Sequence, residues 1–136
     1  MPAFVRWPGK INPGSLSEQV VITMDWTKTI LSAAEVNAQR DDPLDGIDLL
    51  PILTGKKQNT ERALYWRSFQ RAKQKAIRVG DWKYLQDENG EYLFNLVVDK
   101  AEKNDLKEKE KSVFDGLKQK YSEWEKTVLQ PIPLKL

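Results

Sequence analysis

Short β-prone runs in the second half of the chain are the feature that most constrains its fold. They are rich in aromatic and β-branched residues, are separated by turn signals, and cover residues 63–66, 76–79, 82–85 and 92–96. Asn89-Gly90 lies between the last two runs and predicts a tight type I′ hairpin, because that turn needs positive φ at both central residues. The sequence therefore predicts a small antiparallel sheet of about four strands.

The sequence predicts an amphipathic helix after these runs. Apolar residues recur at intervals of three and four over about residues 112–128, namely Val113, Leu117, Tyr121, Trp124 and Val128. Ser112 with Asp115 fits a capping-box pattern, and prolines at 131 and 133 end the helix. We expect the helix to pack on the sheet through Leu117, Tyr121 and Trp124. One amphipathic helix on one antiparallel sheet gives an α+β fold class.

The first part of the chain is less regular. Residues 4–7 and 20–22 are short β-prone runs, each expected to form a strand. Asp25 is the expected N-cap of a helix with Trp26, Ile30 and Ala33 on one face, ending near Asn37. Residues 41–59 mix apolar residues with regular Pro and Gly, which predicts an irregular packed segment. A boundary near residues 55–60 divides the chain into segments 1–55 and 60–136.

Composition excludes several classes of function. The 22 Lys and Arg residues against 20 Asp and Glu give a net charge of +2, far from the footprint of a dedicated nucleic-acid binder. The chain has no Cys and no His, which excludes thiolate catalysis, the catalytic triads that use His, and the commonest ligands of transition metals. No apolar run is long enough to predict a membrane span or signal peptide. We therefore expect a chain that is either cytoplasmic or separated from an N-terminal part that carried the export signal.

Two polar clusters are candidate sites. The first contains Asp41, Asp42, Asp45 and Asp48, but it lacks the ligand alternation of a calcium loop, so we predict turn residues and no metal. The second is a basic, polar stretch between two predicted strands, comprising Arg67, Gln70, Arg71, Lys73, Gln74, Lys75 and Arg78. It is either a loop that recognises an oxyanion or a solvated loop.

Other side chains are expected to have structural roles. Asp25 and Asp81 are predicted to serve as helix cap and turn residue rather than as catalytic groups. The tryptophans are expected in core or interface packing rather than as platforms for sugars. They are Trp7, Trp26, Trp66, Trp82 and Trp124.

Several of these segments, in this order, resemble the formylglycine-dependent sulfatases of the arylsulfatase family. Residues 4–11 (FVRWPGKI) are similar to the segment that follows the active-site half of those enzymes, and residues 44–55 (LDGIDLLPILTG) to their "LDGxSLLPLLxG" stretch. Residues 62–66, 75–85 and 91–96 resemble the strands of the C-terminal subdomain. Residues 99–106 (DKAEKNDL) resemble the "DPxEKNNL" signature, with Lys100 where Pro is usual.

The resemblance implies which parts of a sulfatase the two segments of the chain are, and which catalytic groups the chain lacks. Residues 1–55 would be a remnant of the large alkaline-phosphatase-like α/β catalytic domain, and residues 60–136 the C-terminal subdomain. The family uses a formylglycine made within a "C/S-x-P-x-R" motif and a divalent cation, usually calcium; we expect this chain to hold neither, and no catalytic residue. The basic loop approaches the substrate cleft in the family, which makes Gln74, Lys75 and Arg71 the candidates for a substrate rim.

Two functions remain open. The chain is either the C-terminal part of a sulfuric ester hydrolase, supplying scaffold and part of the cleft rim, or a free-standing module of sulfatase ancestry that binds an anionic saccharide. The first predicts a missing N-terminal catalytic half as partner, a sulfated substrate only in the complete enzyme, and export of that enzyme. Apolar residues of the first segment would then lack their partner surface, which predicts self-association or local disorder there.

Overall fold

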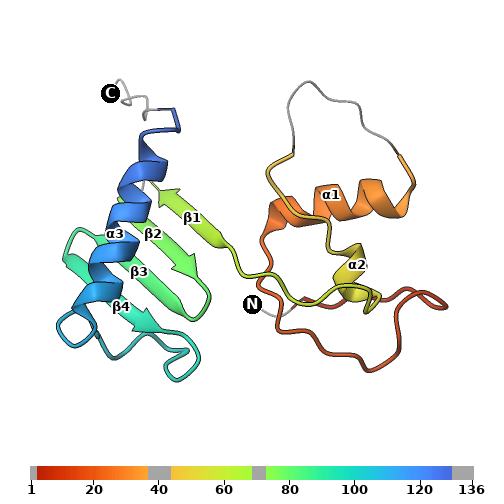
Figure 1. The fold of residues 1–136 in the computed structure, drawn as a ribbon, viewed down its shortest axis with the longest axis horizontal. Coiled ribbons are helices and arrows are strands. Elements are labelled where there is room, and N and C mark those ends of the chain that lie inside the picture. Colours follow the sequence, from red (N-terminus) through yellow and green to blue (C-terminus); the bar gives the residue numbers. More distant parts are fainter. Residues whose placement is uncertain (1–2, 37–43, 69–72, 130–136) are drawn as a thin grey trace. The chain divides into compact units, whose positions relative to one another are not determined.

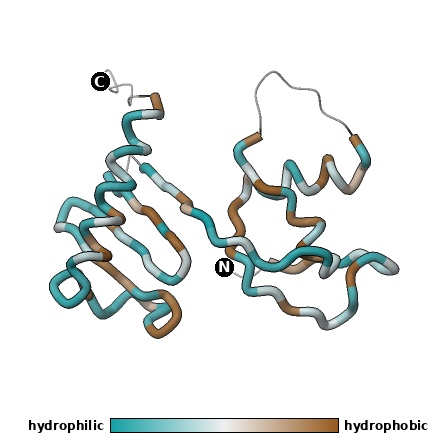
Figure 2. The backbone as a smooth tube through the Cα atoms, viewed as in Figure 1, coloured by the Kyte–Doolittle hydropathy of each residue, from teal (hydrophilic) through white to brown (hydrophobic). Residues whose placement is uncertain are grey.

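The chain forms two compact units in a computed structural model that describes residues 3–36, 44–68, 73–129. The first unit is Met1–Glu61 and the second is Arg62–Leu136. Figure 2 shows hydrophobic stretches in the helices of the first unit and along the strands of the second. The assignment of the first segment to a larger catalytic domain remains a prediction.

The second unit contains an antiparallel sheet whose strands follow one another in sequence order (Figure 1). Its strands are β1 (Ala63–Ser68), β2 (Gln74–Val79), β3 (Trp82–Asp87) and β4 (Gly90–Asn95). Each neighbouring pair is antiparallel, so the sheet is a simple meander. This confirms the predicted four-stranded sheet. The aromatic and β-branched residues of its strands suit a pleated, half-buried surface.

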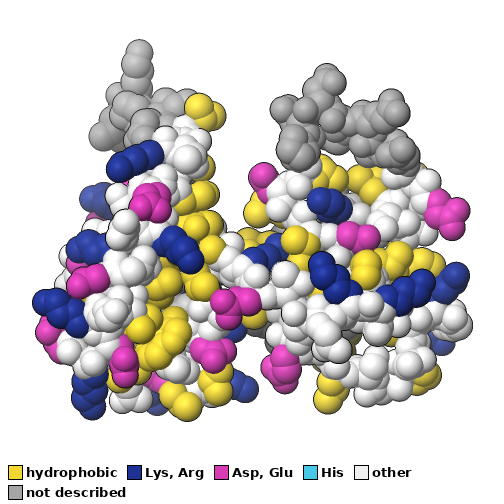
Figure 3. All heavy atoms as spheres, in the orientation of Figure 1, with side chains coloured by type: hydrophobic (Ala, Val, Ile, Leu, Met, Phe, Trp, Pro, Cys, Tyr) yellow, Lys and Arg dark blue, Asp and Glu magenta, His cyan; other side chains and the backbone are white. Residues whose placement is uncertain are grey.

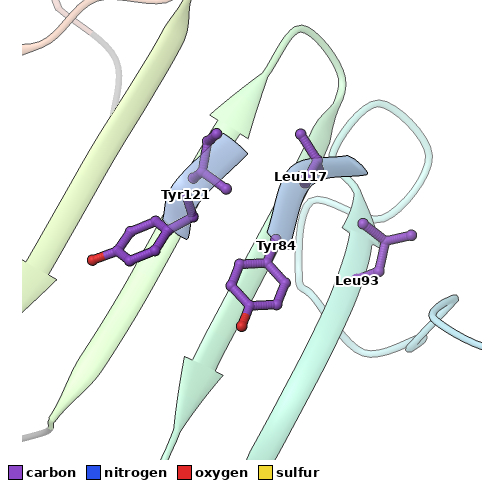
Figure 4. Packing of buried hydrophobic residues seen from close by; sticks show 5 residues of the cluster. Tyr84, Leu93, Leu117 and Tyr121 are labelled. Atoms are coloured by element: carbon purple, nitrogen blue, oxygen red, sulfur yellow. The ribbon is translucent and has the colours of Figure 1, made fainter. Parts of the chain in front are cut away.

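One long helix, α3 (Lys111–Glu125), packs against β2 and β3. Leu117 and Tyr121 of this helix are buried together with sheet residues, including Tyr84 and Leu93 (Figure 4). Trp124 is half-buried and packs against the same cluster. Burying a large apolar side chain stabilises a fold by roughly 1.5–3 kcal/mol, so the packing of α3 on the sheet is a main source of stability for the second unit. The predicted α+β class and helix face are confirmed.

The hairpin between β3 and β4 differs from the predicted type. Asp87 pairs with Gly90, so the two loop residues are Glu88 and Asn89, and neither has positive φ. The Asp87 side chain holds the turn instead, because its Oδ1 accepts hydrogen bonds from the backbone N–H of Asn89 (2.8 Å) and of Gly90 (3.1 Å). The hairpin is where the sequence predicted it, but the type I′ assignment to Asn89-Gly90 was wrong.

The start of α3 also differs from the prediction. Its N-cap is Glu110, with no side-chain hydrogen bond, and Ser112 lies inside the first turn. The predicted capping box of Ser112 and Asp115 is therefore wrong. A backbone turn precedes the helix, in which the N–H groups of Lys109 and Glu110 bond to the carbonyl of Leu106, so the chain already curls before Ser112.

The loop after β4 is held by three carboxylates. Asp99 accepts hydrogen bonds from the N–H groups of Lys103 and Asn104, both at 2.8 Å. Glu102 binds the Lys83 ammonium with both oxygens at 2.7 Å, although its own backbone lies at a φ of 55°. Asp105 accepts the N–H of Leu93. Asp99 thus closes the loop on itself, while Glu102 and Asp105 fasten it to β3 and β4.

The described residues of the first unit form two helices, α1 (Thr23–Ala33) and α2 (Leu50–Leu53). The described residues before α1 include no strand, so the strands predicted at 4–7 and 20–22 are wrong. A β-prone run becomes a strand only when a neighbour pairs with its backbone, and the described residues offer none here. The helix α1 ends at Ala33 because Glu35 takes a positive φ of 55°, while Asn37 lies outside the described residues.

Asp25 joins the two helical segments and also caps α1, from the third helical position rather than from the N-cap position. The N-cap is Ile22, and Asp25 is the third helical residue; its carboxylate is fully buried and accepts hydrogen bonds from the N–H of Ile22 (2.8 Å) and of Ile47 (3.0 Å). Thr29 donates to the Asp25 carbonyl (2.7 Å) and accepts the N–H of Leu49 (2.9 Å). The predicted N-cap position was therefore wrong by three residues, although Asp25 still contributes to the cap by accepting the N–H of Ile22.

Candidate substrate-rim site

Gln74 and Lys75, two of the predicted rim residues, lie at the end of the sheet where the chain passes from β1 to β2. Ser68 ends β1 opposite Gln74, and Arg67 pairs with Lys75. Gln74 is exposed and Lys75 half-buried. Arg71, like Gln70, falls outside the described residues, so the structure brings together two of the three predicted rim residues.

Lys75 and Arg67 share one carboxylate from the end of α3. The Lys75 ammonium lies 2.9 Å from Glu125 Oε2, and the Arg67 guanidinium lies 3.8 Å from Glu125 Oε1. Arg67 also donates to the backbone carbonyl of Leu129. Within this group of three side chains, two cations face one anion.

Aromatic side chains border these charges. The Lys75 ammonium lies 5.9 Å from the centre of the Tyr121 ring, close enough for a cation–π contact. Tyr65 and Trp124 stack with ring centres 4.7 Å apart and an interplanar angle of 9°. Burial, with the nearby Glu125 carboxylate as the second cause, raises the pKa of Tyr121 to about 12, so this phenol stays protonated at neutral pH.

The cluster of Arg67, Lys75 and Glu125 suits binding rather than bond cleavage. Its cations can attract an anionic or hydroxyl-rich group, while Glu125 keeps both at fixed positions. Lys73 lies at the edge of the same loop and pairs with Glu88 at 3.1 Å on an exposed surface. Such an arrangement supplies charge and orientation without an activated nucleophile.

Sequence reasoning missed Glu125. The residue is separated from Lys75 by 50 positions, and a single carboxylate near the end of a charged helix carries no local signal for such a pair. Only the packing of α3 along the sheet brings the two together. The tyrosines at 65 and 121 were predicted as parts of a strand and a helix face, and their association with the cations was likewise not predicted.

The carboxylates predicted as turn residues do not form a metal site among the described residues. Both oxygens of Asp48 are engaged, one by the Ser32 hydroxyl at 2.7 Å and the other by the Leu50 N–H at 2.9 Å. No group of three or more acidic, His or Cys side chains suitable for a metal ion occurs within residues 3–36, 44–68 and 73–129. Asp41 and Asp42 lie outside those ranges. The described residues thus do not fit the divalent cation of the sulfatases.

Two of the five tryptophans lie where core packing was predicted, and Trp66 does not. Trp82 and Trp124 pack against the core cluster of the second unit, while Trp7 and Trp26 line a depression of the first unit. Trp66 is 41% exposed. Asp81 lies in the loop between β2 and β3, where its carbonyl accepts the N–H of Leu96 at 2.8 Å. No helix in the described part of the chain has the length and apolar character that a membrane crossing requires.

Comparison with known protein families decides the identity of the chain. The model of the family "N-sulphoglucosamine sulphohydrolase, C-terminal" matches residues 1–127. The chain belongs to this family. The resemblance to the C-terminal portion of a sulfatase is thereby confirmed for nearly the whole sequence.

Curated sulfatases are similar over parts of this C-terminal sulfatase chain. It is 42% identical to the uncharacterized sulfatase YdeN of Escherichia coli over 57 residues, which are 42% of the chain and 10% of YdeN. It is 39% identical to the steryl-sulfatase of Rattus norvegicus over 61 residues, or 45% of the chain and 11% of that enzyme. With the N-acetylgalactosamine-6-sulfatase of Canis lupus familiaris the identity is 38% over 66 residues, or 48% and 13%. These matches thus cover about a tenth of each relative.

Solved structures share the fold. The chain superposes on Ps i-CgsB, in its complex with k-i-k-neocarrahexaose, with a TM-score of 0.75 and 22% identity, over 87% of this chain and 27% of the other. A protein of Bacteroides thetaiotaomicron, described under the metabolism of multiple glycosaminoglycans, gives a TM-score of 0.69 with 20% identity and the same coverage. Both proteins are therefore several times longer than the segment that they share with this chain.

Proposed function

We propose that this chain is the C-terminal part of a sulfatase that hydrolyses sulfuric esters, and that the catalytic residues lie in a part of the enzyme outside these 136 residues. The match of the family model over residues 1–127 carries the proposal. The chain itself contains no Cys, and none of its serines has a proline two positions later, as the formylglycine motif requires. The cation and the formylglycine of the family would accordingly be held by the other part.

In this proposal the chain has two roles. The second unit is a scaffold, stable through its own core of sheet and helix. The end of its β1–β2 hairpin, with Gln74, Lys75 and Arg71, forms part of the rim of the substrate cleft. The surplus positive charge of Arg67 and Lys75 over Glu125 supports this role, since a sulfated substrate is anionic.

The gene sequence upstream of Met1 provides the first test. An in-frame segment with the formylglycine motif, followed by turnover of an aryl sulfate by the joined product, is expected. A stop codon directly upstream, with no sulfatase polypeptide that copurifies, would favour the free-standing module of sulfatase ancestry.

Kinetics of the joined enzyme test the rim. Lys75→Ala should raise KM for a sulfated saccharide while kcat changes little, because the residue binds substrate without taking part in the chemistry. Lys118→Ala is the control, since this lysine also pairs with one glutamate, Glu91, on the same unit, although its side chain is more exposed. Equal KM values for both variants would exclude Lys75 from the rim.

A further inference from the structure

The tip of the β3–β4 hairpin contains Asn89-Gly90, the only place in the chain where a glycine follows an asparagine. Asn89 is exposed and lies in the two-residue loop, so that both water and the neighbouring backbone can reach its side-chain amide. The next residue supplies a backbone nitrogen with no side chain beside it, and glycine allows backbone groups to approach closely. Asparagine is a thermally labile residue, and this environment favours a reaction within the loop.

The turn itself requires the glycine. Gly90 is the first residue of β4 and pairs with Asp87 across the hairpin. Its φ of 151° is a backbone conformation that residues with a side chain rarely adopt. A bulkier residue, which would shield the backbone nitrogen, is therefore disfavoured at this position. The dipeptide thus follows from the geometry of the hairpin.

The other asparagines that the structure describes have a different neighbour. Proline, threonine, leucine and aspartate follow Asn12, Asn59, Asn95 and Asn104, respectively. Asn104 is the closest comparison, because it is also exposed and also lies in a loop of the second unit. Its backbone N–H is held by Asp99 at 2.8 Å. Asn104 therefore differs from Asn89 mainly in the side chain that follows it.

Asp87 restrains the backbone of this loop. Its Oδ1 accepts the N–H of Asn89 at 2.8 Å and the N–H of Gly90 at 3.1 Å. The Gly90 nitrogen is therefore already engaged, and its hydrogen bond has to break before the nitrogen can turn toward the Asn89 side chain. A carboxylate is a strong acceptor, so Asp87 slows such an approach without excluding it.

We infer that Asn89 is a site of spontaneous covalent modification, at which the Gly90 backbone nitrogen displaces the side-chain amide nitrogen as ammonia. The Gly90 nitrogen forms a bond to Cγ of Asn89, the bond from Cγ to Nδ2 breaks, and the departing nitrogen takes the proton of the Gly90 N–H. The product is a succinimide. Water then adds to one of its two carbonyl carbons and opens the ring, which gives aspartate or isoaspartate. The reaction needs no oxidant, metal or partner, so it is independent of the proposed function.

Either product adds a negative charge to the hairpin. Charged side chains of both signs are interspersed on the visible side of the second unit (Figure 3), and Glu88 takes part in this pattern by pairing with Lys73 at 3.1 Å. A new carboxylate beside Glu88 competes for that lysine. Isoaspartate also lengthens the loop backbone by one carbon atom, which disturbs the spacing that lets Asp87 hold both N–H groups. We therefore expect the modified hairpin to be looser than the parent.

Peptide mapping of the purified gene product tests the assignment. The protein is incubated at mildly alkaline pH, and the converted fraction of each asparagine is followed over weeks by mass spectrometry, with electron-transfer fragmentation to distinguish isoaspartate from aspartate. We expect conversion at Asn89 to be several-fold faster than at Asn104. Asp87→Ala should accelerate conversion at Asn89 several-fold and leave Asn104 unchanged. Asp87→Asn, which keeps an acceptor oxygen, should stay near the parent rate.

The remaining outcomes overturn the inference. Equal conversion at Asn89 and Asn104 would exclude a specific site in the hairpin, and aspartate without isoaspartate would contradict attack by the Gly90 nitrogen. An unchanged rate at Asn89 in the Asp87→Ala variant would contradict the restraint by Asp87. A variant that loses its fold should convert Asn104 faster as well, because the loop that holds the Asn104 N–H opens too. The ratio of the two rates therefore reports on the hairpin, and an unchanged ratio in Asp87→Ala also counts against the restraint.

Discussion

The Lys75 ammonium lies 2.9 Å from the Glu125 carboxylate and so ties the β1–β2 hairpin to the last turn of α3. Arg67 approaches the same carboxylate, and Trp124, next to Glu125 in the helix, stacks on Tyr65 in β1. Charge and aromatic packing therefore position this end of the sheet together. A change that loosens α3 should disturb the proposed rim as well as the core.

Trp124→Ala tests the packing of α3 on the sheet. Loss of the stacked contact with Tyr65 and the edge contact with Tyr121 should lower the free energy of unfolding by roughly 3 kcal/mol, the lower end of the range for Trp truncation, because Trp124 is half-buried. Urea unfolding monitored by circular dichroism measures the change. Lys120→Ala, at an exposed position of the same helix, should change it little. Equal stability of the two variants would show that the apolar face of α3 does not pack in the core.

Substitution of two glycines by alanine should act in opposite directions. At Gly46 the new Cβ would meet backbone atoms of Met24 at 2.3–2.5 Å, so Gly46→Ala should destabilise the first unit by about 1–3 kcal/mol or more. At Gly116, within α3, nothing lies within 4 Å, and alanine should stabilise the helix by roughly 0.5–1 kcal/mol. Thermal melts of both variants measure these signs. A neutral Gly46→Ala would contradict the close approach of the two segments.

Asp25→Ala should open the connection between α1 and the segment that leads into α2. The change leaves the N–H groups of Ile22 and Ile47 without their carboxylate acceptor, and an unsatisfied buried donor costs about 1–3 kcal/mol. Hydrogen exchange should accelerate over residues 22–33 and 46–53 while β1–β4 keep their protection. Asp45→Ala, an exposed carboxylate in the same segment, is the control. Unchanged hydrogen exchange in the Asp25 variant would show that Asp25 does not hold the segments of the first unit together.

Acid should weaken the second unit through Glu91. A hydrogen bond from Lys118, opposed by burial and supported by the Tyr84 hydroxyl, holds the pKa of Glu91 below its usual 4.5. A lowered pKa in the folded state means that the stabilising contribution is complete above 4.5 and is lost as the pH falls through the folded value. Urea unfolding measured from neutral pH to below pH 4.5 should show this loss, and Glu91→Gln should reduce the slope. An unchanged slope in the variant would assign the acid sensitivity to other groups.

Local sequence patterns predicted the elements that depend on local periodicity. The sheet follows from alternation along short runs, and the buried face of α3 from the spacing of Leu117, Tyr121 and Trp124. The family resemblance rested on several short segments in a fixed order, and the family comparison confirmed it.

Such patterns could not predict contacts between residues that are far apart in the sequence. Asp25 and Ile47 are 22 positions apart, and Lys75 and Glu125 are 50 apart, so neither pair leaves a signature in a short window. The expected strands at 4–7 and 20–22 failed for a related reason, since a strand depends on a partner that the run itself does not specify. The short helix α2, Leu50–Leu53, lies in the segment predicted to be irregular, because Pro51 indicates a break in a short window, whereas a proline in the first turn is compatible with a helix.

The most direct test of the central claim is an assay of the purified 136-residue chain with an aryl sulfate, with and without added calcium. We predict no turnover, because the chain has neither the formylglycine motif nor a described group of residues that could hold the cation. The same assay on the chain joined to its upstream segment should show hydrolysis. Turnover that copurifies with the 136-residue chain through orthogonal columns would contradict the claim that catalysis resides in another part of the enzyme.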